Sequence, residues 1–134
     1  MNYWLVKSEP STYSFERLIK EKLTVWDGVR NYLARNNLKA MKLGELVLFY
    51  HSNEGKSVVG VAKVVKEAYP DPSINDERWV AIDIEAVKPL KNHVSLEQIK
   101  SDPELAQVAL IKQSRLSVMP LNKAEFERII KLGS

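Results

Sequence analysis

The sequence contains no cysteine and no long apolar run. The missing cysteines exclude disulfides, thiolate zinc sites and cysteine nucleophiles. No stretch approaches the roughly 18 consecutive apolar residues of a membrane span, so we expect no membrane partner. The first residues, MNYWLVKSEP, turn polar after six positions, which is unlike a secretion signal. These absences together predict a cytoplasmic protein.

The motifs of common catalytic and cofactor-binding sites are also missing. Neither GxGxxG nor GxSxG occurs in the chain. Residues 55–57 end like a phosphate-binding loop, but Tyr50 stands where the GxxxxGKS/T pattern requires glycine. The two histidines, His51 and His93, lack the i, i+4 spacing of a helical zinc site. We therefore expect no metal, no cofactor and no enzyme activity.

The length and the charge of the chain suggest one domain with one basic region. A chain of 134 residues, 45% of them hydrophobic, suits a single domain over residues 1–134, and we favour a monomer. The net charge is only +3, but residues 17–42 carry seven cations against two anions. This concentration of positive charge suits an anionic polymer, and it suits a solvated helix face equally well.

Local signals in the first third of the chain predict two helices with a turn between them. Ser14 occupies an N-cap position before a helical apolar stripe, and a second helix is expected over residues 31–41. Between the two helices, Asp27 and Gly28 indicate a turn, and this interpretation places Trp26 in it.

The rest of the chain is dominated by strand patterns. Strands are expected over residues 2–6, 45–52, 57–65, 79–87 and 116–119. The segments 45–52 and 57–65 are apolar on both faces, as in central strands, whereas 79–87 alternates as in a half-buried strand. Short helices are expected in the C-terminal third. The pattern predicts an α+β fold, a small and mostly antiparallel β-barrel flanked by short helices.

Polar and aromatic residues gather at four predicted element ends, where functional sites are usually built. These segments are residues 7–10, 26–31, 50–52 and 115–118. Trp26 could fill the core beneath its loop, or it could offer an aromatic face on which a nucleobase stacks.

Other residues in these segments also have two interpretations each. Arg30 could form a salt bridge at a helix end or bind a phosphate, and Asn31 could cap a helix or contact a base edge. Ser8 and Ser52 could be turn serines or hydrogen-bond donors to a ligand. His51 is expected to be buried and hydrogen-bonded.

Six sequence blocks together resemble one known family. They are YWLVKSEP near the start, WDGVRNYLARN at 26–36, LVLFYHS at 46–52, AYPDP at 68–72, RW at 78–79 and RLSVMPL at 115–121. In this order they are similar to the EVE domain, a family with a PUA-like fold that is related to the YTH and ASCH domains. The resemblance implies a small barrel with helices around it and a pocket for modified bases. Its motif positions fall on Lys7, Ser8, Glu9, Trp26, Gly28, Arg30, Asn31, Arg35, Tyr50, His51, Ser52 and Ser117.

The resemblance leads us to predict a non-catalytic module that binds nucleic acid by recognising a modified base. Modified cytosine in DNA is favoured, and a modified RNA base is the other nucleic-acid ligand considered. The expected base-binding residues are Ser8, Glu9, Trp26, Arg30, Asn31, Tyr50, His51, Ser52 and Ser117. The expected phosphate-binding residues are Lys7, Arg30, Arg35, Lys39 and Lys42.

Two further hypotheses stay open beside this one. The same fold could serve as a sensor of small molecules or nucleotides, or as a protein-interaction module. An enzyme acting on modified nucleotides would need an acid in the pocket, and Glu9 and Asp27 are the plausible residues for that role. Binding to free nucleosides alone would favour the sensor, and a mass change in a modified oligonucleotide would favour the enzyme.

Overall fold

The computed structural model describes residues 1–134 and is built on one six-stranded sheet. The strands are β1 (Tyr3–Ser8), β2 (Leu23–Trp26), β3 (Leu46–His51), β4 (Ser57–Pro70), β5 (Val80–Ser95) and β6 (Val118–Leu121). They pair in the order β2-β5-β4-β3-β1-β6. The β1–β3 pair is parallel and every other pair is antiparallel.

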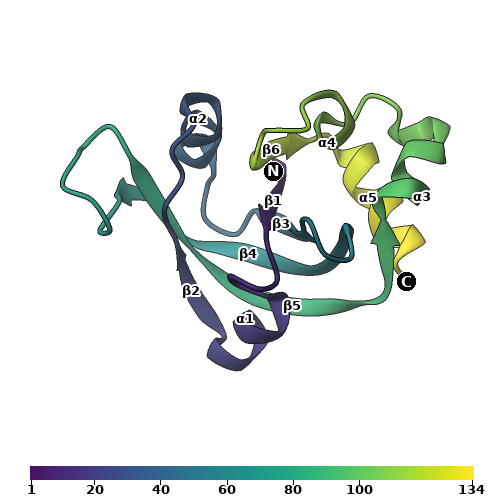
Figure 1. Cartoon of the computed structure of the whole chain (residues 1–134), viewed down its shortest axis with the longest axis horizontal. Coiled ribbons are helices and arrows are strands. Elements are labelled where there is room, and N and C mark those ends of the chain that lie inside the picture. The colour runs from purple at the N-terminus through teal and green to yellow at the C-terminus, as the bar shows by residue number, and fades with distance from the viewer.

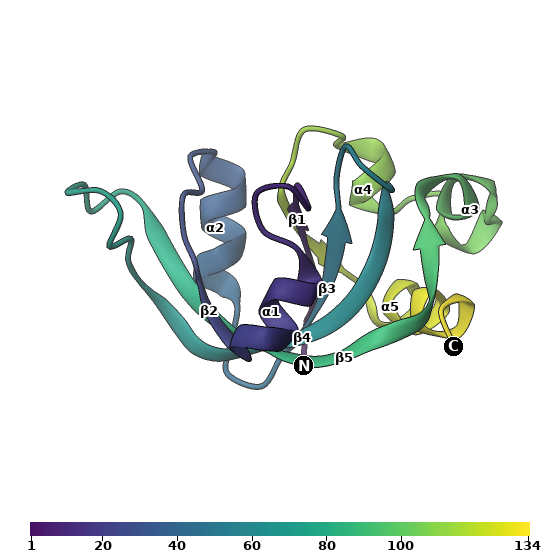
Figure 2. The same cartoon turned by 60° about the horizontal axis from the view of Figure 1, so that its bottom comes forward.

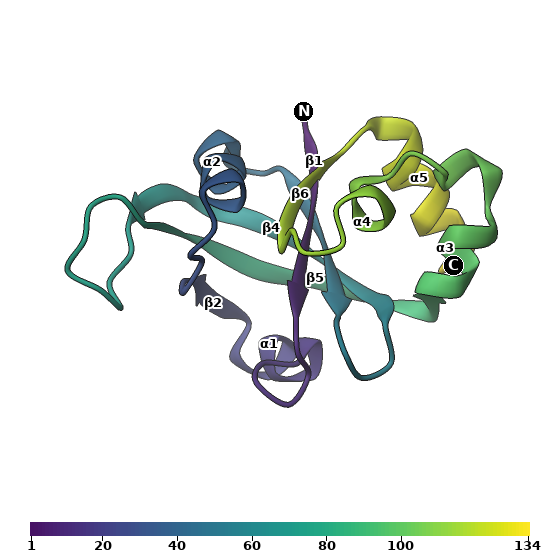
Figure 3. The same cartoon turned by 45° about the horizontal axis from the view of Figure 1, so that its top comes forward.

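Short helices surround the sheet. They are α1 (Phe15–Glu21), α2 (Tyr32–Ala40), α3 (Leu96–Ser101), the 3₁₀ turn η1 (Pro103–Leu105), α4 (Ala109–Lys112) and α5 (Lys123–Leu132). Helices α3, α4 and α5 gather at one end of the molecule, whereas the β4–β5 loop projects past α2 at the other (Figures 1 and 3). The longest helix, α5, has ten residues, and none of the helices could cross a lipid bilayer.

The α+β class is confirmed, but closure of the sheet into a barrel is not. Strands β2 and β6 are the two ends of the pairing order, and they do not pair with each other. The long strands β4 and β5 curve strongly beneath the other elements, so that the sheet forms an open cradle (Figure 2). An apolar pattern on both faces shows that a strand is enclosed, but it does not show how the sheet achieves the enclosure.

Two strands are longer than their sequence patterns predicted. The strand expected over 57–65 continues to Pro70, and the strand expected over 79–87 continues to Ser95. The register between them shifts at four places, for example between Val64 and Lys66. Such bulges bend a strand and break its two-residue period, which is why the alternation ended before the strand did.

A further strand, β2, was not predicted, because Asp27 and Gly28 indicated a turn that included Trp26. Residues Leu23–Trp26 pair with β5, and the Cα partner of Trp26 is Ile82. Trp26 therefore lies at the end of an edge strand and not in a turn. The sequence pattern missed β2 because this strand has four residues and an exposed, half-buried alternation without a strong apolar face.

The hydrophobic core consists of 32 buried residues along the chain from Trp4 to Ile129. Helix α1 enters this core through Phe15, whose ring packs edge-on against Phe49 of β3 with centroids 5.3 Å apart. Gly60 of β4 permits this approach, since a Cβ atom there would lie 2.3 Å from the Phe15 ring. Helix α1 is thereby held against the sheet beside the end of β1.

Candidate functional site

A pocket of about 520 Å³ opens beside the end of β1. Its volume lies in the range of sites that hold small organic ligands, roughly 300–1,000 Å³. Three parts of the chain enclose it: the end of β1 with the loop to α1, strand β2 with the loop to α2, and the residue before β6. The lining residues are Lys7, Ser8, Glu9, Thr12, Tyr13, Thr24, Val25, Trp26, Asp27, Gly28, Val29, Arg30 and Ser117.

The pocket brings together six of the residues predicted to bind a base or a phosphate, although they come from distant parts of the chain. These are Lys7, Ser8, Glu9, Trp26, Arg30 and Ser117. The backbone amide of Lys7 donates to the carbonyl of Ser117 over 2.9 Å, where the end of β1 meets the segment before β6. The sheet order β3-β1-β6 thus places two of the predicted segments on one side of the pocket.

The other predicted base-binding residues do not line this pocket. The side chain of Asn31 caps α2 by accepting a hydrogen bond from the Ala34 amide over 2.9 Å. Tyr50 is buried in the core. The Nε2 atom of His51 accepts a hydrogen bond from the Phe15 amide over 3.1 Å, and burial lowers the pKa of His51. Ser52 does not line the pocket either, and its backbone amide donates to the Ser8 carbonyl over 2.9 Å. A role in ligand contact stays a prediction for all four residues.

Among the predicted phosphate-binding residues, only Lys7 and Arg30 line the pocket. Arg35 and Lys39 lie on α2, and Lys42 follows that helix. These three cations are thus positioned outside the pocket, where they could contact a long ligand but not a small one enclosed in it.

Trp26 is the largest side chain in the pocket wall. It is half-buried, and its indole meets the Phe49 ring edge-on with centroids 5.5 Å apart and an interplanar angle of 87°. The residue thus combines the two interpretations of its sequence, because it packs against the core and also lines the pocket. A ring fixed in this way can stack on a ligand with little loss of side-chain entropy.

Polar groups on the β1 side of the pocket are held by hydrogen bonds to neighbouring segments. The Ser8 hydroxyl donates to the Tyr13 carbonyl over 2.6 Å, and the amide of Asn53 donates to the Glu9 carboxylate over 2.7 Å. The Lys7 ammonium donates to the carbonyl of Ser114 over 2.8 Å, and burial lowers the pKa of Lys7. These groups are fixed in position and offer a ligand both hydrogen-bond acceptors and a cation.

Sequence reasoning missed four wall residues in β2 and in the loop before α1. Thr12, Tyr13, Thr24 and Val25 line the pocket, but none of them was selected as a binding residue. For Thr24 and Val25 the usable signal was their β-branched side chains next to Trp26, since such residues favour a strand. No comparable local signal marks Thr12 and Tyr13, because their position depends on how α1 packs on the sheet.

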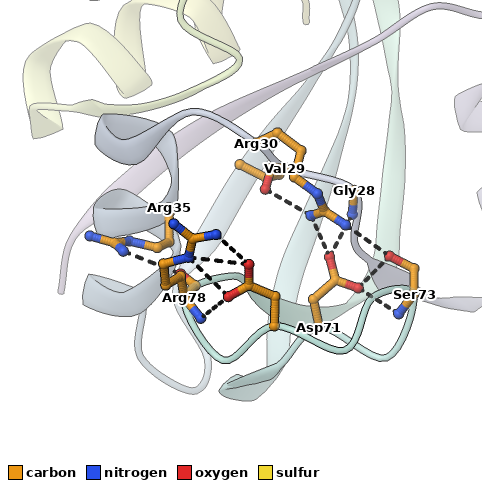
Figure 4. A network of polar contacts seen from close by, with 8 residues as sticks. Gly28, Val29, Arg30, Arg35, Asp71, Ser73 and Arg78 are labelled. Carbon is orange, nitrogen blue, oxygen red and sulfur yellow. Dashed lines mark hydrogen bonds and ion pairs between the residues drawn. The ribbon is translucent and has the colours of Figure 1, made fainter.

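Sequence reasoning also missed Asp71, which follows β4 in the loop between β4 and β5 and contacts the pocket wall. Its side chain is fully buried. The Oδ2 atom accepts hydrogen bonds from the Gly28 amide and from Arg30 Nη1, each over 2.9 Å. The Oδ1 atom accepts from the amide and the hydroxyl of Ser73 over 2.7 and 2.5 Å. Figure 4 shows this carboxylate between Ser73 and the segment that carries Gly28 and Arg30.

The surroundings of Asp71 favour its charged form. Burial alone raises the pKa of this carboxyl, but the hydrogen bonds from Ser73, Arg30 and Gly28 outweigh burial and lower the pKa from 3.8 to about 2. Arg30 pairs with this carboxylate and also contacts an aromatic ring, because its guanidinium lies 5.6 Å from the centre of the Trp79 ring. Its side chain is 36% exposed.

The lowered pKa of Asp71 predicts a loss of stability in acid. Because the folded-state pKa lies below the unfolded-state value, the stabilisation is complete above pH 4–5 and is lost as the pH falls towards 2. The expected contribution is on the order of 1–2 kcal/mol, allowing for solvent screening. Urea unfolding between pH 5 and pH 2.5 should show a steeper loss for the wild type than for Asp71→Asn. Parallel pH profiles for the two proteins would contradict the prediction.

The structure offers no group of three or more histidine, aspartate or glutamate side chains arranged to hold a metal ion.

Comparison with known proteins identifies close relatives over almost the entire chain. The model of the EVE domain family matches residues 2–132. Mouse thymocyte nuclear protein 1 is 38% identical over 165 aligned positions, which cover 98% of this chain and 73% of that protein. These positions exceed the 134 residues of this chain, so the mouse protein carries insertions relative to it. The relative's name describes a nuclear protein, and cytoplasmic localisation of this chain stays a prediction.

Two solved structures share the fold. A protein from Agrobacterium tumefaciens is 42% identical, with a TM-score of 0.98 over 100% of this chain and 94% of that chain. The human THYN1 protein, solved in complex with DNA that contains 5-methylcytosine, is 36% identical. Its TM-score is 0.92 over 100% of this chain and 98% of that chain.

Proposed function

This chain belongs to the EVE domain family, and from that premise we propose that it binds DNA by enclosing a modified base, preferably 5-methylcytosine, without altering it chemically. The observation that carries the proposal is the pocket beside Trp26. It occurs in a fold that matches, over its whole length, a human protein solved with 5-methylcytosine DNA. The pocket is large enough for one base, and the DNA in the relative's complex is the reason for proposing 5-methylcytosine.

In the proposed complex the base leaves the helical stack and lies against the indole of Trp26. Unstacking a base requires a few kcal/mol, and stacking on an aromatic side chain returns about 1–3 kcal/mol. The Ser8 hydroxyl, the Glu9 carboxylate and Ser117 line the same space and are placed to contact the polar edge of the base. Since the energies of unstacking and of stacking on Trp26 nearly cancel, contacts with the phosphates must supply much of the affinity.

The proposed phosphate contacts come from three cations outside the pocket and from Lys7 in its wall. Lys39 and Lys42 are exposed and take part in no salt bridge, and neither does the half-buried Arg35. Lys7 stands at the pocket itself. Each phosphate that is neutralised lowers the logarithm of the binding constant by about 0.9 per tenfold rise in salt. Binding should therefore weaken markedly with salt.

A single added methyl group gives limited discrimination by contact area. Its burial contributes about 0.8 kcal/mol, a few-fold in affinity. Stronger preference for a modified base requires that the unmodified base leaves a polar group unpaired, or that the pocket wall fits the methyl closely. A fixed wall is consequently central to the proposed function.

A binding panel with short duplexes tests the proposal. One strand carries a single 5-methylcytosine, and the controls are the unmodified duplex and the same sequences as RNA, each measured at two salt concentrations. We expect tighter binding of the methylated DNA duplex and an unchanged oligonucleotide mass afterwards. Equal affinity for methylated and unmodified DNA would contradict base recognition, and a mass change would contradict the non-catalytic role. A preference for free nucleosides over every duplex would favour the sensor hypothesis.

The glycine in the pocket wall gives a second prediction. Gly28 has a φ of +76° and open space around its Cβ position, so Gly28→Ala introduces strain without a clash. We expect it to lower the free energy of unfolding by about 1 kcal/mol and to weaken binding of methylated DNA. Gly55→Ala is the matched control, because Gly55 has a φ of +81° with equally open space but lies outside the pocket. Equal DNA affinity of the two variants would contradict a role for the Gly28 backbone.

A further inference from the structure

We propose that Asp71 is the positioning residue of the pocket: from outside the lining, it fixes the wall segment, residues 27–30, in the conformation that recognises a base. The inference rests on the proposed function for the identity of the ligand. The claim that Asp71 positions residues 27–30 rests on hydrogen-bond geometry, and it can be tested without any ligand.

The contacts of Asp71 connect two loops that are distant in the sequence. Asp71 follows the end of β4, and its backbone amide donates to the Trp79 carbonyl over 3.0 Å, which closes the β4–β5 loop on itself. From this closed loop the carboxylate reaches the Gly28 amide and the Arg30 guanidinium, 43 and 41 residues earlier in the chain. Figure 4 shows that Gly28 and Arg30 converge on the same side of the carboxylate.

The chemistry of a buried carboxylate makes this position specific. A buried ionised group is tolerated only when hydrogen bonds satisfy its oxygens. Here Ser73 satisfies Oδ1, and the wall segment satisfies Oδ2. Moving the wall segment would leave Oδ2 unpaired in the interior, so the charge of Asp71 opposes any displacement of Gly28 and Arg30.

The same contact determines what Arg30 does. Its guanidinium is neutralised by Asp71 at 2.9 Å, and it also donates to the Val29 carbonyl over 3.0 Å. A DNA phosphate would have to compete with a carboxylate that is already in place. Arg30 therefore shapes the pocket, and the salt dependence of binding comes from the other cations.

The variant Asp71→Asn tests this assignment. An asparagine has nearly the same shape, but its amide nitrogen cannot accept a hydrogen bond, so the donors on one side of it lose their acceptor. Asp76→Asn is the matched control, since Asp76 lies in the same loop and pairs with Arg78 over 2.7 Å without contacting the wall segment. Both variants remove one carboxylate and release one arginine.

Fluorescence anisotropy with methylated and unmodified duplexes gives the decisive comparison. We expect Asp71→Asn to lower the ratio of methylated to unmodified affinity at least fivefold, whereas Asp76→Asn keeps it within twofold. The salt slope of Asp71→Asn should steepen by about 0.9, because the released Arg30 gains a phosphate contact. An affinity ratio within twofold of the wild type for Asp71→Asn overturns the proposal, as does an equal loss in Asp76→Asn. An unchanged slope overturns the assignment of Arg30.

Hydrogen exchange of the free protein separates this inference from the proposed function. The Gly28 amide should exchange at least tenfold faster in Asp71→Asn than in the wild type or in Asp76→Asn, and equal rates overturn the positioning role. If the wild type does not distinguish the duplexes, the proposed function fails while the exchange rates still decide the role of Asp71. If Asp71→Asn does not fold, Ser73→Ala replaces it, because it keeps the Asp71 carboxylate and removes the hydroxyl contacts to Oδ1 and to Arg30 Nη2. In that variant the Gly28 amide should exchange its hydrogen about threefold faster than in the wild type, and an unchanged rate overturns the proposal.

Discussion

Trp26→Leu is expected to weaken binding of 5-methylcytosine DNA at least tenfold while the protein stays folded. The leucine keeps apolar contact with Phe49, which the indole meets edge-on at 5.5 Å, but it removes the aromatic face that lines the pocket. Base stacking contributes about 1–3 kcal/mol, and 1.4 kcal/mol corresponds to a tenfold change in affinity. Fluorescence anisotropy against the methylated and unmodified duplexes measures the change.

Two further variants separate stacking from stability. Trp26→Phe restores an aromatic ring and should recover affinity to within about threefold of the wild type. Tyr3→Leu removes another half-buried ring, one that stacks on Phe126 with centroids 4.4 Å apart and lies outside the pocket. If Trp26→Leu binds methylated DNA as tightly as Tyr3→Leu does, Trp26 does not stack on the base.

Features of the fold that depend on neighbouring residues could be predicted from the sequence. Ser14 caps α1 by accepting from the Arg17 amide over 3.1 Å, and Asn31 caps α2. Capping boxes also begin α3 at Ser95 and α5 at Asn122, in the C-terminal third where short helices were expected. A cap involves residues within one helical turn, so its signal survives in the sequence.

Features that depend on distant pairing could not be predicted in the same way. Strand β2 exists because Leu23–Trp26 pair with residues 82–85 of β5, and the bulges between β4 and β5 are shifts in the register of two paired strands. The open edge between β2 and β6 likewise reflects the packing of elements far apart in the chain. Propensity gives weak evidence for such contacts, because strand formation depends on the partner strand and on burial.

The candidate site shows the same division. The family resemblance selected Lys7, Ser8 and Trp26, which do line the pocket. It also selected His51, whose ring instead accepts a hydrogen bond from the first residue of α1. Asp71 lies in the AYPDP block of the resemblance but was not selected as a site residue. An acid between two prolines is typical of a loop, and its partners in the pocket wall lie more than 40 positions away. A sequence motif therefore marks residues that gather in one region of the fold, but it does not separate those that line the pocket from those that support its wall.

Glu45→Ala is expected to destabilise the fold by about 3 kcal/mol, although Glu45 does not line the pocket. The side chain is buried, with 5% of the residue exposed. It accepts hydrogen bonds from the Trp4 indole over 2.9 Å and from the amides of Asn2 and Lys42 over 2.8 Å each. Burial alone raises the pKa of Glu45, but these hydrogen bonds outweigh it and lower the pKa. The alanine leaves three donors without their acceptor, at about 1–3 kcal/mol for each one that water cannot reach.

Thermal and urea unfolding measure this effect, with a shift of the melting temperature of roughly 10 °C downwards. Glu67→Ala is the control, because the exposed Glu67 accepts one hydrogen bond, from the Leu43 amide over 3.2 Å, and should change stability by less than about 0.5 kcal/mol. Since Glu45 joins the start of β1 to the loop before β3, its loss should also loosen the parallel β1–β3 pair that carries Lys7 and Ser8 to the pocket. Equal stability of the two variants would show that the three donors find other partners.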